Sequence, residues 1–324
     1  MTTHRGEVPG KLMLAGEYTV LHAPACAVAG ATVPLVRWLL TPAATGTITV
    51  HAYGQVFLWR PGDPAPQGIA GFVEATVQAF GADALATHAL TLEVGGQVGG
   101  HKLGLGTSAA VAVATGRAIC AARGVPFDGA ALRRCEHAHR AAQGGRGSGY
   151  DVFAIGAGGL SRYDRTNARV ERLRWPDGLF AVALYAGSGA DTREAIGGRI
   201  QPGPDDIERI GTAERGVAEA FRDGDAAGCL RAIAHAEAAF APLVARSAWL
   251  QHAGLAAIAE TVARAGGVMR TSGAGGGDCA LGVFDSVAAR EAAADAWEAG
   301  GGLVVARWPE ALWPDEDAVT ATGE

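Results

Sequence analysis

Val98 to Gly116, V-G-G-H-K-L-G-L-G-T-S-A-A-V-A-V-A-T-G, is the stretch that decides the fold. It begins with glycines and a lysine and continues past Thr107 and Ser108 into an Ala/Val-rich run without a helix breaker. This pattern predicts a loop that leads into a buried helix, with Thr107 or Ser108 as its N-cap. The first amides of a helix have no intrahelical partner and carry about half a positive charge, and glycines let further amides converge there. We therefore expect a phosphate group at this helix start.

Two commoner phosphate-binding loops fit the sequence less well. A Walker loop requires G-x-x-x-x-G-K-[ST], and this string does not occur. The spacing of Gly104, Gly106 and Ala109 matches the loose dinucleotide fingerprint, which also requires a following strand that ends in an acidic residue. Instead, the sequence after Arg123 returns at Asp128 to another helical pattern, which disfavours a dinucleotide site.

Lysine is rare in this chain: Lys11 and Lys102 are the only lysines among 27 basic residues, and both lie in glycine-bearing motifs. A chain that uses arginine on its surface keeps an ammonium group where a compact point charge is needed. The alternative is that biased composition left two ordinary surface lysines. The first interpretation predicts two functional cations.

Composition limits the interpretation further. With 324 residues, 49% of them hydrophobic, the chain suits two modest domains or one large one, globular and soluble. A net charge of −6 with interspersed acids and bases favours no nucleic-acid partner. Five cysteines without a C-x-x-C pair favour free thiols in a reducing cytoplasm. Met1 to Val8 is polar, and no 18 apolar residues follow one another, so we expect neither a secretory signal nor a membrane span.

The hydrophobic pattern predicts an α+β fold. Helices are expected over residues 72–80, 107–123, 128–142, 204–266 with breaks near Gly224 and Pro242, and 286–299. Strands are expected over residues 9–21 on both sides of a glycine turn, 46–60 as an antiparallel pair, 88–94, 179–185, 267–270, 280–284 and 303–308. The order of the last elements suggests helices on one face of an antiparallel sheet.

Four glycine-rich motifs each carry polar residues of a different kind. They are Lys11 with Glu17, Lys102 with Ser108, Ser148 with Asp151, and Asp278. Each motif alone is equally well explained as a tight turn. Together they would supply a cation, a hydroxyl for Mg²⁺, a carboxylate and a second anion-binding loop, which phosphoryl transfer requires.

These motifs carry a resemblance to a known family. They read P-G-K-L-M-L-A-G-E-Y-T-V-L (9–21), K-L-G-L-G-T-S-A-A (102–110), Q-G-G-R-G-S-G-Y-D-V (143–152) and S-G-A-G-G-G-D-C (272–279). In this order they resemble the motifs of the GHMP small-molecule kinases, and within them those of the phosphomevalonate kinases. Tyr18 stands where mevalonate kinases and galactokinases usually carry histidine, and Asp278 is typical of the phosphomevalonate kinase form. The resemblance extends from Pro9 to about Arg307.

The resemblance implies a two-domain GHMP kinase fold. Residues 1–175 would form an ATP-binding domain with a left-handed βαβ crossover, similar to ribosomal protein S5 domain 2, and residues 176–324 a ferredoxin-like domain. ATP and a small phosphorylated substrate would lie in the cleft between them, with Mg²⁺ as the metal. The protein would be a cytoplasmic monomer or homodimer without a membrane or nucleic-acid partner.

The resemblance also implies roles for individual residues. Lys11 and Asp151 would flank the acceptor as catalytic residues, and Ser108 would reach Mg²⁺. The nucleotide would be held by Lys102, Gly104, Leu105, Gly106, Thr107, Ser108 and Ala109. Candidates for the acceptor are Glu17, Tyr18, His101, Arg146, Ser148, Gly149, Thr192, Arg193, Gly275, Gly276 and Asp278. Residues 273–277 would close over the phosphates or the substrate.

One position departs from the family pattern. Mevalonate kinases place a Mg²⁺-binding glutamate eleven residues before the catalytic aspartate, and this chain has Arg140 there. Glu136, His137 and His139 are near this position in the sequence. Either ATP oxygens, Ser108 and water hold Mg²⁺, or the site is built differently.

Three functions therefore stay open at this point. The first is transfer of a phosphoryl group to an acceptor that already carries a phosphate. The second is transfer to an unphosphorylated alcohol, and the third is binding of a nucleotide or metabolite without catalysis. The joint presence of Lys11, Ser108 and Asp151 favours an enzyme, because a binding protein does not need all three.

Overall fold

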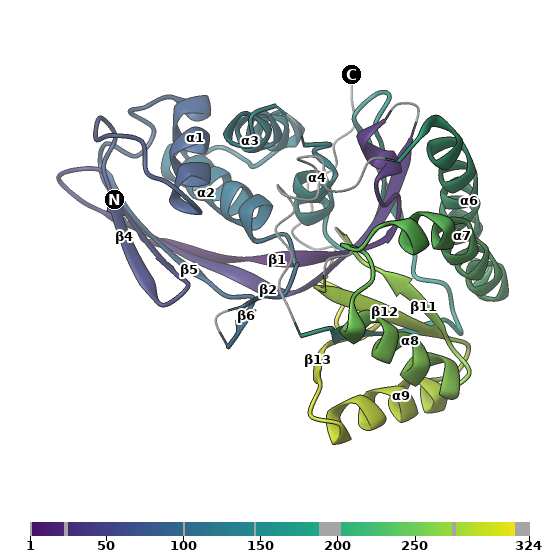
Figure 1. The fold of residues 1–324 in the computed structure, drawn as a ribbon. Coiled ribbons are helices and arrows are strands. Elements are labelled where there is room, and N and C mark those ends of the chain that lie inside the picture. The colour runs from purple at the N-terminus through teal and green to yellow at the C-terminus, as the bar shows by residue number, and fades with distance from the viewer. Residues whose placement is uncertain are drawn as a thin grey trace.

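The computed structural model describes residues 2–22, 25–99, 101–145, 147–187, 202–273 and 277–314. Its strands form two main sheets, and Figure 1 shows the N-terminal sheet on the left and the C-terminal sheet at the lower right. The N-terminal sheet contains β1 (His4–Ala15), β2 (Cys26–Pro42), β3 (Thr47–Ala52), β4 (Gln55–Trp59), β5 (His88–Val94), β8 (Leu160–Asp164) and β9 (Arg169–Leu173).

The N-terminal sheet has the order β4-β3-β5-β2-β8-β9, with β1 paired to β2. Its pairs are antiparallel except for β3 and β5, which are parallel and are connected through β4 and α1 (Ala70–Phe80). This connection is the crossover expected from the resemblance. A short separate hairpin, β6 (Gln97–Val98) with β7 (His101–Lys102), leads into the loop before α2.

Four helices pack on one face of the N-terminal sheet (Figure 1). They are α1, α2 (Thr107–Arg123), α3 (Gly129–Ala142) and α4 (Tyr150–Ala157). Helix α2 contacts strands β1, β2 and β5 as well as the other three helices, and residues 109–114 are completely buried. Its small Ala and Val side chains let the sheet and the other three helices pack closely around it. The sequence Val98 to Gly116 therefore does form a loop and a buried helix.

The C-terminal sheet has the order β11-β12-β10-β13 and is antiparallel. Its strands are β10 (Phe180–Tyr185), β11 (Val268–Thr271), β12 (Cys279–Phe284) and β13 (Leu303–Trp308). Helices α8 (Ala253–Arg264) and α9 (Val287–Ala299) pack on it, while α6 (Pro204–Asp223) and α7 (Ala226–Arg246) pack against each other and reach β1 or β11. This arrangement confirms the expected α+β fold with a ferredoxin-like C-terminal half.

The two halves share one hydrophobic core, which includes residues from strands of both sheets such as Val28 and Ala183. At Gly30 in β2 an added Cβ would come within 2.6 Å of the Trp308 ring in β13, so glycine allows this close approach. The sheets change between the end of β9 and the start of β10, and the division at residue 175 falls in this interval and stays a prediction.

Three local predictions were wrong. Gly106, with φ of 79°, is the N-cap of α2, and no side chain caps it, so neither Thr107 nor Ser108 is the N-cap. The segment Thr19–Leu21 is a 3-10 helix instead of a second strand. Pro242 lies inside α7 because Phe240 and Leu243, both 2% exposed, pack this part of the helix into a hydrophobic cluster. Their burial outweighs the hydrogen bond that proline removes.

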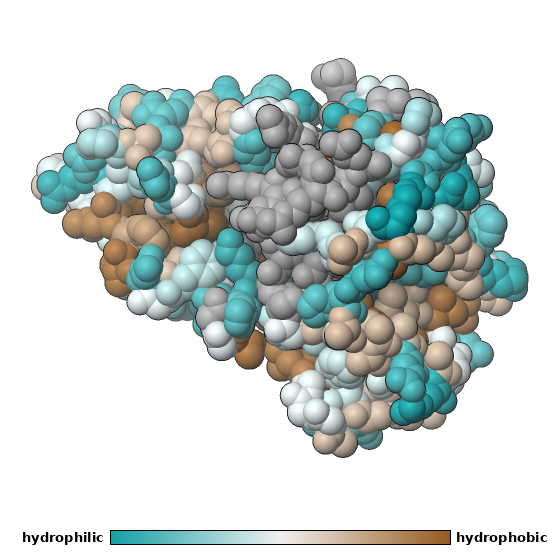
Figure 2. Space-filling model, in the orientation of Figure 1, coloured by the Kyte–Doolittle hydropathy of each residue, from teal (hydrophilic) through white to brown (hydrophobic). Residues whose placement is uncertain are grey.

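Some features of the surface bear on the sequence predictions. Val56 and Leu58, at the edge of the sheet in β4, are 64% and 66% exposed, and Figure 2 shows apolar residues gathered over this end of the molecule. All five cysteines are buried and free, as expected. Within the residues that the structure describes, we find no helix with the length and apolar character of a membrane span.

Candidate active site

A cavity of about 600 Å³ lies where β1, the start of α2, the start of α4 and the residue before β12 meet. Twelve residues that the sequence predicted as functional line it. They are Lys11, Glu17, Tyr18, Lys102, Gly104, Gly106, Thr107, Ser108, Ser148, Asp151, Gly273 and Asp278. All four glycine-rich motifs therefore contribute to one cavity, although they are far apart in the sequence.

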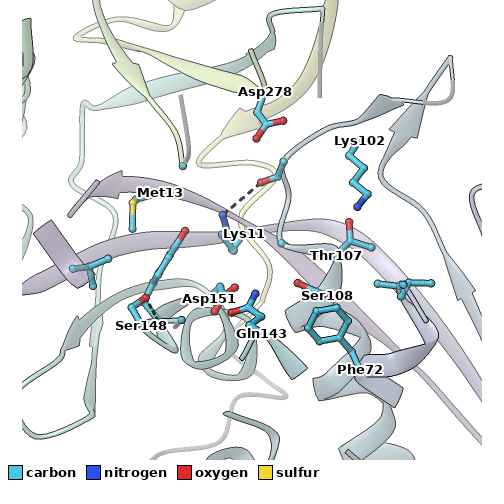
Figure 3. Close-up of a pocket in the computed structure, with 18 of the residues that line it drawn as sticks. Lys11, Met13, Phe72, Lys102, Thr107, Ser108, Gln143, Ser148, Asp151 and Asp278 are labelled. Atoms are coloured by element: carbon cyan, nitrogen blue, oxygen red, sulfur yellow. Dashed lines mark hydrogen bonds between the residues drawn. The ribbon is translucent and has the colours of Figure 1, made fainter. Parts of the chain in front are cut away.

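Lys11 lies at the centre of this site on β1, and Figure 3 shows it between Asp278 and Asp151. The residue is 6% exposed, its Nζ donates a hydrogen bond to the Gly104 carbonyl at 3.4 Å, and Nζ is 5.3 Å from the centre of the Tyr150 ring. Burial lowers the pKa of Lys11, but Tyr150, Asp151 and Asp278 raise it more, and the net shift is upward. Lys11 is therefore held as an ammonium ion at the cavity.

The start of α2 forms the second part of the site. Gly104 and Gly106 have φ of 73° and 79°, which side chains rarely adopt. A Cβ on Gly104 would lie 2.7 Å from Asp278, and one on Gly106 would lie 3.1 Å from the Lys11 side chain. Because the N-cap residue Gly106 has no side chain to accept from the first amides of α2, these amides can face an anion in the cavity.

Asp151 comes from the first turn of α4. Its Oδ1 accepts a hydrogen bond from the Val152 amide at 3.0 Å, and its side chain is 19% exposed. The preceding Gly149 is the N-cap with φ of 83°, where a Cβ would lie 2.8 Å from the Glu136 side chain. Glycine at this position lets the chain turn tightly, and the turn directs Asp151 at the cavity.

His139 on α3 is a residue whose role was not predicted. Its side chain is 1% exposed, and its Nε2 lies 3.0 Å from Ser108 Oγ and 3.9 Å from Asp151 Oδ2. Arg140, the residue at the eleven-residue spacing, instead pairs through Nε with Glu136 Oε1 at 3.0 Å. Helix α3 therefore presents an imidazole behind the site in place of an acidic group.

The donor set agrees with weak protein coordination of Mg²⁺. Ser108 and Asp151 supply oxygen atoms at the cavity, and no group of three or more His, Cys, Asp or Glu that could hold a metal exists in the part of the chain that the structure describes. Mg²⁺ typically keeps water and substrate phosphates as most of its ligands and uses only one or two protein carboxylates. The residues present fit such an ion.

Glu17 and Tyr18 line the cavity but are held by the C-terminal half. Glu17, which the sequence placed in the motif of Lys11, pairs with the buried Arg270 of β11. Tyr18 stacks on Phe240 of α7 with ring centres 5.8 Å apart, and burial raises the pKa of its hydroxyl. Both side chains therefore connect the cavity to helices and strands of the second half.

Of the other predicted residues that the structure describes, Ser148 lines the cavity, whereas His101, Leu105 and Ala109 do not. Ser148 is 6% exposed, and its carbonyl accepts from the Tyr163 hydroxyl at 3.1 Å. His101 is exposed on β7 and does not line the cavity. Leu105 and Ala109 have buried side chains, so only their backbone groups can serve the site. Arg146, Thr192, Arg193, Gly275 and Gly276 lie outside the described residues.

Sequence reasoning missed several residues of the cavity wall. They include Met13, Tyr53, Phe57, Ile69, Phe72, Gln143 and Tyr150. Tyr150 was within reach, because it lies between the flagged residues Ser148 and Asp151, and its ring is the one under Lys11. Met13 and Gln143 also lie inside the quoted motifs, whereas Tyr53, Phe57, Ile69 and Phe72 carry no local signal, since apolar and aromatic residues on strands and helices are usually explained by the core.

Comparison with known proteins shows which family this fold and this cavity resemble. The family model described as "GHMP kinases N terminal domain" matches residues 69–159, which contain the start of α2, His139 and Asp151. This segment of the chain thus matches a GHMP kinase N-terminal domain, and the fold of the whole chain is that of the solved kinases described next, which indicates a phosphotransferase.

Individual relatives point in the same direction. The chain is 28% identical over 341 residues to a curated phosphomevalonate kinase of Streptomyces sp. (strain CL190), covering 87% of this chain and 90% of the relative. A structure of Streptococcus pneumoniae phosphomevalonate kinase in complex with phosphomevalonate and AMPPNP is similar with a TM-score of 0.80 and 18% identity, over 95% of this chain and 99% of the other. A structure of Methanococcus jannaschii mevalonate kinase is also similar, with a TM-score of 0.74 and 13% identity, over 94% of this chain and 98% of the other.

Proposed function

We propose that this protein transfers the γ-phosphoryl group of ATP to 5-phosphomevalonate and forms mevalonate 5-diphosphate. The observation that carries the proposal is that the Lys11 ammonium and the uncapped start of α2 face one cavity. The start of α2 suits the phosphates of a nucleotide, and the Lys11 ammonium suits a second anion next to them. The similarity to a phosphomevalonate kinase over most of the chain supports this acceptor.

The proposed reaction explains why a buried lysine is needed. A phosphomonoester has a second pKa near 6 and is mostly dianionic at pH 7, so the main difficulty is its repulsion from the γ-phosphate. At about 4 Å and an effective dielectric constant of about 20, two unit charges interact by roughly 4 kcal/mol. Lys11, placed between the two phosphates, would offset repulsion of this size.

Asp151 has a smaller role in this proposal. An alcohol must lose its proton when it attacks a phosphate, so a carboxylate base contributes typically 10²- to 10⁴-fold with such an acceptor. A phosphate acceptor is already deprotonated. Asp151, whose charge acts on Lys11, therefore mainly orients Lys11 and the acceptor.

The cofactor side of the proposal follows from the donor set. Mg²⁺ bound with the nucleotide would neutralise charge on its phosphates, and Ser108 is the residue that would hold it together with ATP oxygens and water. Lys102 lines the outer part of the cavity with its Nζ 5.1 Å from the centre of the Tyr53 ring. We expect it to add positive charge beside the nucleotide.

A coupled ADP-release assay tests the proposal directly. Mevalonate and 5-phosphomevalonate are compared side by side with ATP and Mg²⁺, and turnover only with 5-phosphomevalonate is expected. Turnover with mevalonate and none with its 5-phosphate would replace the proposal by a kinase that acts on an unphosphorylated alcohol. ATP binding without turnover on any alcohol or phosphate of this kind would indicate a binding protein.

A further inference from the structure

His139 lies directly behind the wall of the proposed active site. Its ring packs against Phe72 with centres 5.1 Å apart, and its side chain is 1% exposed. The residues in front of it, Ser108, Gln143 and Asp151, line the cavity and are labelled in Figure 3. His139 therefore touches the groups that face the ligand without itself lining the cavity.

One atom of His139, Nε2, lies near Ser108, Gln143 and Asp151. Nε2 is 3.0 Å from Ser108 Oγ, 3.5 Å from the amide nitrogen of Gln143 and 3.9 Å from Asp151 Oδ2. The first distance is a normal hydrogen bond, whereas the carboxylate is too far away for one. An amide nitrogen only donates, so the contact with Gln143 at 3.5 Å favours the tautomer in which Nε2 is unprotonated. The shorter distance then assigns the single lone pair of Nε2 to the Ser108 hydroxyl.

We propose that His139 is a positioning residue that orients the Ser108 hydroxyl for metal binding. A serine hydroxyl has one proton and two lone pairs, and a metal ligand must turn its lone pairs to the ion. When Nε2 accepts the proton of Ser108 from behind, the lone pairs of Oγ face the cavity. The inference rests on the proposed function, which places the phosphates of a nucleotide and their Mg²⁺ in front of this hydroxyl.

The arrangement also accounts for the lack of an acidic residue at position 140 of α3. Arg140 is turned to Glu136 and its side chain is 38% exposed, so the eleven-residue position contributes nothing to the cavity. An acidic side chain would bind the ion directly. A buried imidazole acts instead through a ligand, in the way that groups behind a metal site generally orient the residues that bind the metal.

A double-mutant cycle tests this role. His139→Leu removes the acceptor, Ser108→Ala removes the hydroxyl, and the double variant removes both. Mn²⁺ affinity is measured by electron paramagnetic resonance on the full chain with a non-hydrolysable ATP analogue, and analogue affinity is measured separately with EDTA. We expect each single variant to lose about tenfold or more in Mn²⁺ affinity, the double variant to lose no more than either, and metal-free analogue affinity to stay unchanged.

Two further variants separate orientation from packing. His139→Gln keeps an amide oxygen that can accept from Ser108, so we expect it to retain most of the Mn²⁺ affinity. His137→Leu, on the same helix with a side chain 78% exposed, is the matched control and should change nothing. Equal losses in His139→Leu and His139→Gln, or losses that add to those of Ser108→Ala, would overturn the inference.

A measurement on the unaltered protein needs no variant to fold. With ¹⁵N-labelled histidine, a bound Mn²⁺ should show no directly bound imidazole nitrogen. Strong coupling to ¹⁵N would overturn the inference and make His139 a metal ligand. If the analogue does not bind at all, both the proposed function and this inference are wrong. If the analogue binds and Mn²⁺ affinity is unchanged in His139→Leu, only the inference is wrong.

Discussion

Lys11 and Arg270 are both buried cations surrounded by carboxyl groups, but only one of them faces a cavity. Lys11 donates a hydrogen bond to a carbonyl at 3.4 Å, and the carboxylates that act on it line the same cavity of about 600 Å³. Arg270 is in direct contact with three glutamates. A buried charge that its neighbours leave partly unpaired can act on a ligand, whereas one enclosed by partners can only stabilise the fold.

The Arg270 cluster consists of Arg270 on β11, Glu17 after β1, Glu214 on α6 and Glu237 on α7. Arg270 contacts Glu214 at 2.5 Å and Glu237 at 2.9 Å, and Glu214 also accepts from the Gly16 amide at 2.9 Å. Burial raises the pKa of Glu214 and lowers that of Arg270 to about 9. The cluster thus joins the end of β1 to three elements of the C-terminal half.

The largest expected effect comes from breaking this cluster. Arg270→Met leaves three carboxyl groups without their shared cation, and we expect it to lower the free energy of unfolding by about 3–5 kcal/mol. Urea unfolding measures this loss. Arg264→Met is the control, because its partner Glu260 is on the surface and such pairs contribute at most about 1 kcal/mol. Equal small losses in both variants would show that the enclosed cluster does not stabilise the fold.

Lys11 should show the opposite behaviour. Lys11→Met removes the proposed counter-charge worth roughly 4 kcal/mol, so we expect kcat to fall by about 10³-fold while the urea midpoint changes little. Asp151→Asn should cost less, about tenfold to hundredfold, if Asp151 mainly orients Lys11 and the acceptor. A much greater loss of kcat in Asp151→Asn than in Lys11→Met would contradict this division of roles.

The next effect tests how closely the loop and Asp278 approach each other. Gly104→Ala combines a φ of 73° with a Cβ 2.7 Å from Asp278, and we expect a loss of about 1–3 kcal/mol in unfolding together with a higher KM for ATP. Gly99→Ala is the matched control, since φ is 57° and no atom lies within 4 Å of its Cβ. Similar losses in both variants would mean that strain alone, and not contact with Asp278, requires glycine at this position.

The sequence indicated the residues that line the cavity better than it indicated the Arg270 cluster, and there is a physical reason. Phosphate binding requires glycines and a helix start, which leave a local pattern at Gly104, Gly106 and the following helix. The pairing of Glu17 with Arg270 joins residues more than 250 positions apart and leaves none. Glu17 was therefore recognised as important from its motif, but its partner was not predictable.

The same distinction explains the errors at short range. The rule that serine or threonine caps a helix favoured Thr107 or Ser108, yet Gly106 is the N-cap. A side-chain cap would occupy amides that an anion would otherwise bind. His139 was visible only as one of several polar residues on α3, because its contact with Ser108 depends on how α3 packs beside α2.

The smallest expected effect is a pH dependence that arises in the Arg270 cluster. Burial raises the pKa of Glu237 from 4.5 to about 8 in the folded protein. The folded state therefore holds this proton more tightly than the unfolded state, so the stability from this group is complete below about pH 4.5 and is lost as pH rises to about 8. We expect the free energy of unfolding to fall by about 1–2 kcal/mol over this range. This is less than for a fully buried carboxyl, because the Glu237 side chain is 22% exposed. Thermal unfolding of the unaltered protein and Glu237→Gln between pH 5 and pH 9 measures it: the midpoint of the variant should fall less with rising pH, and a steeper fall in the variant would contradict the shift.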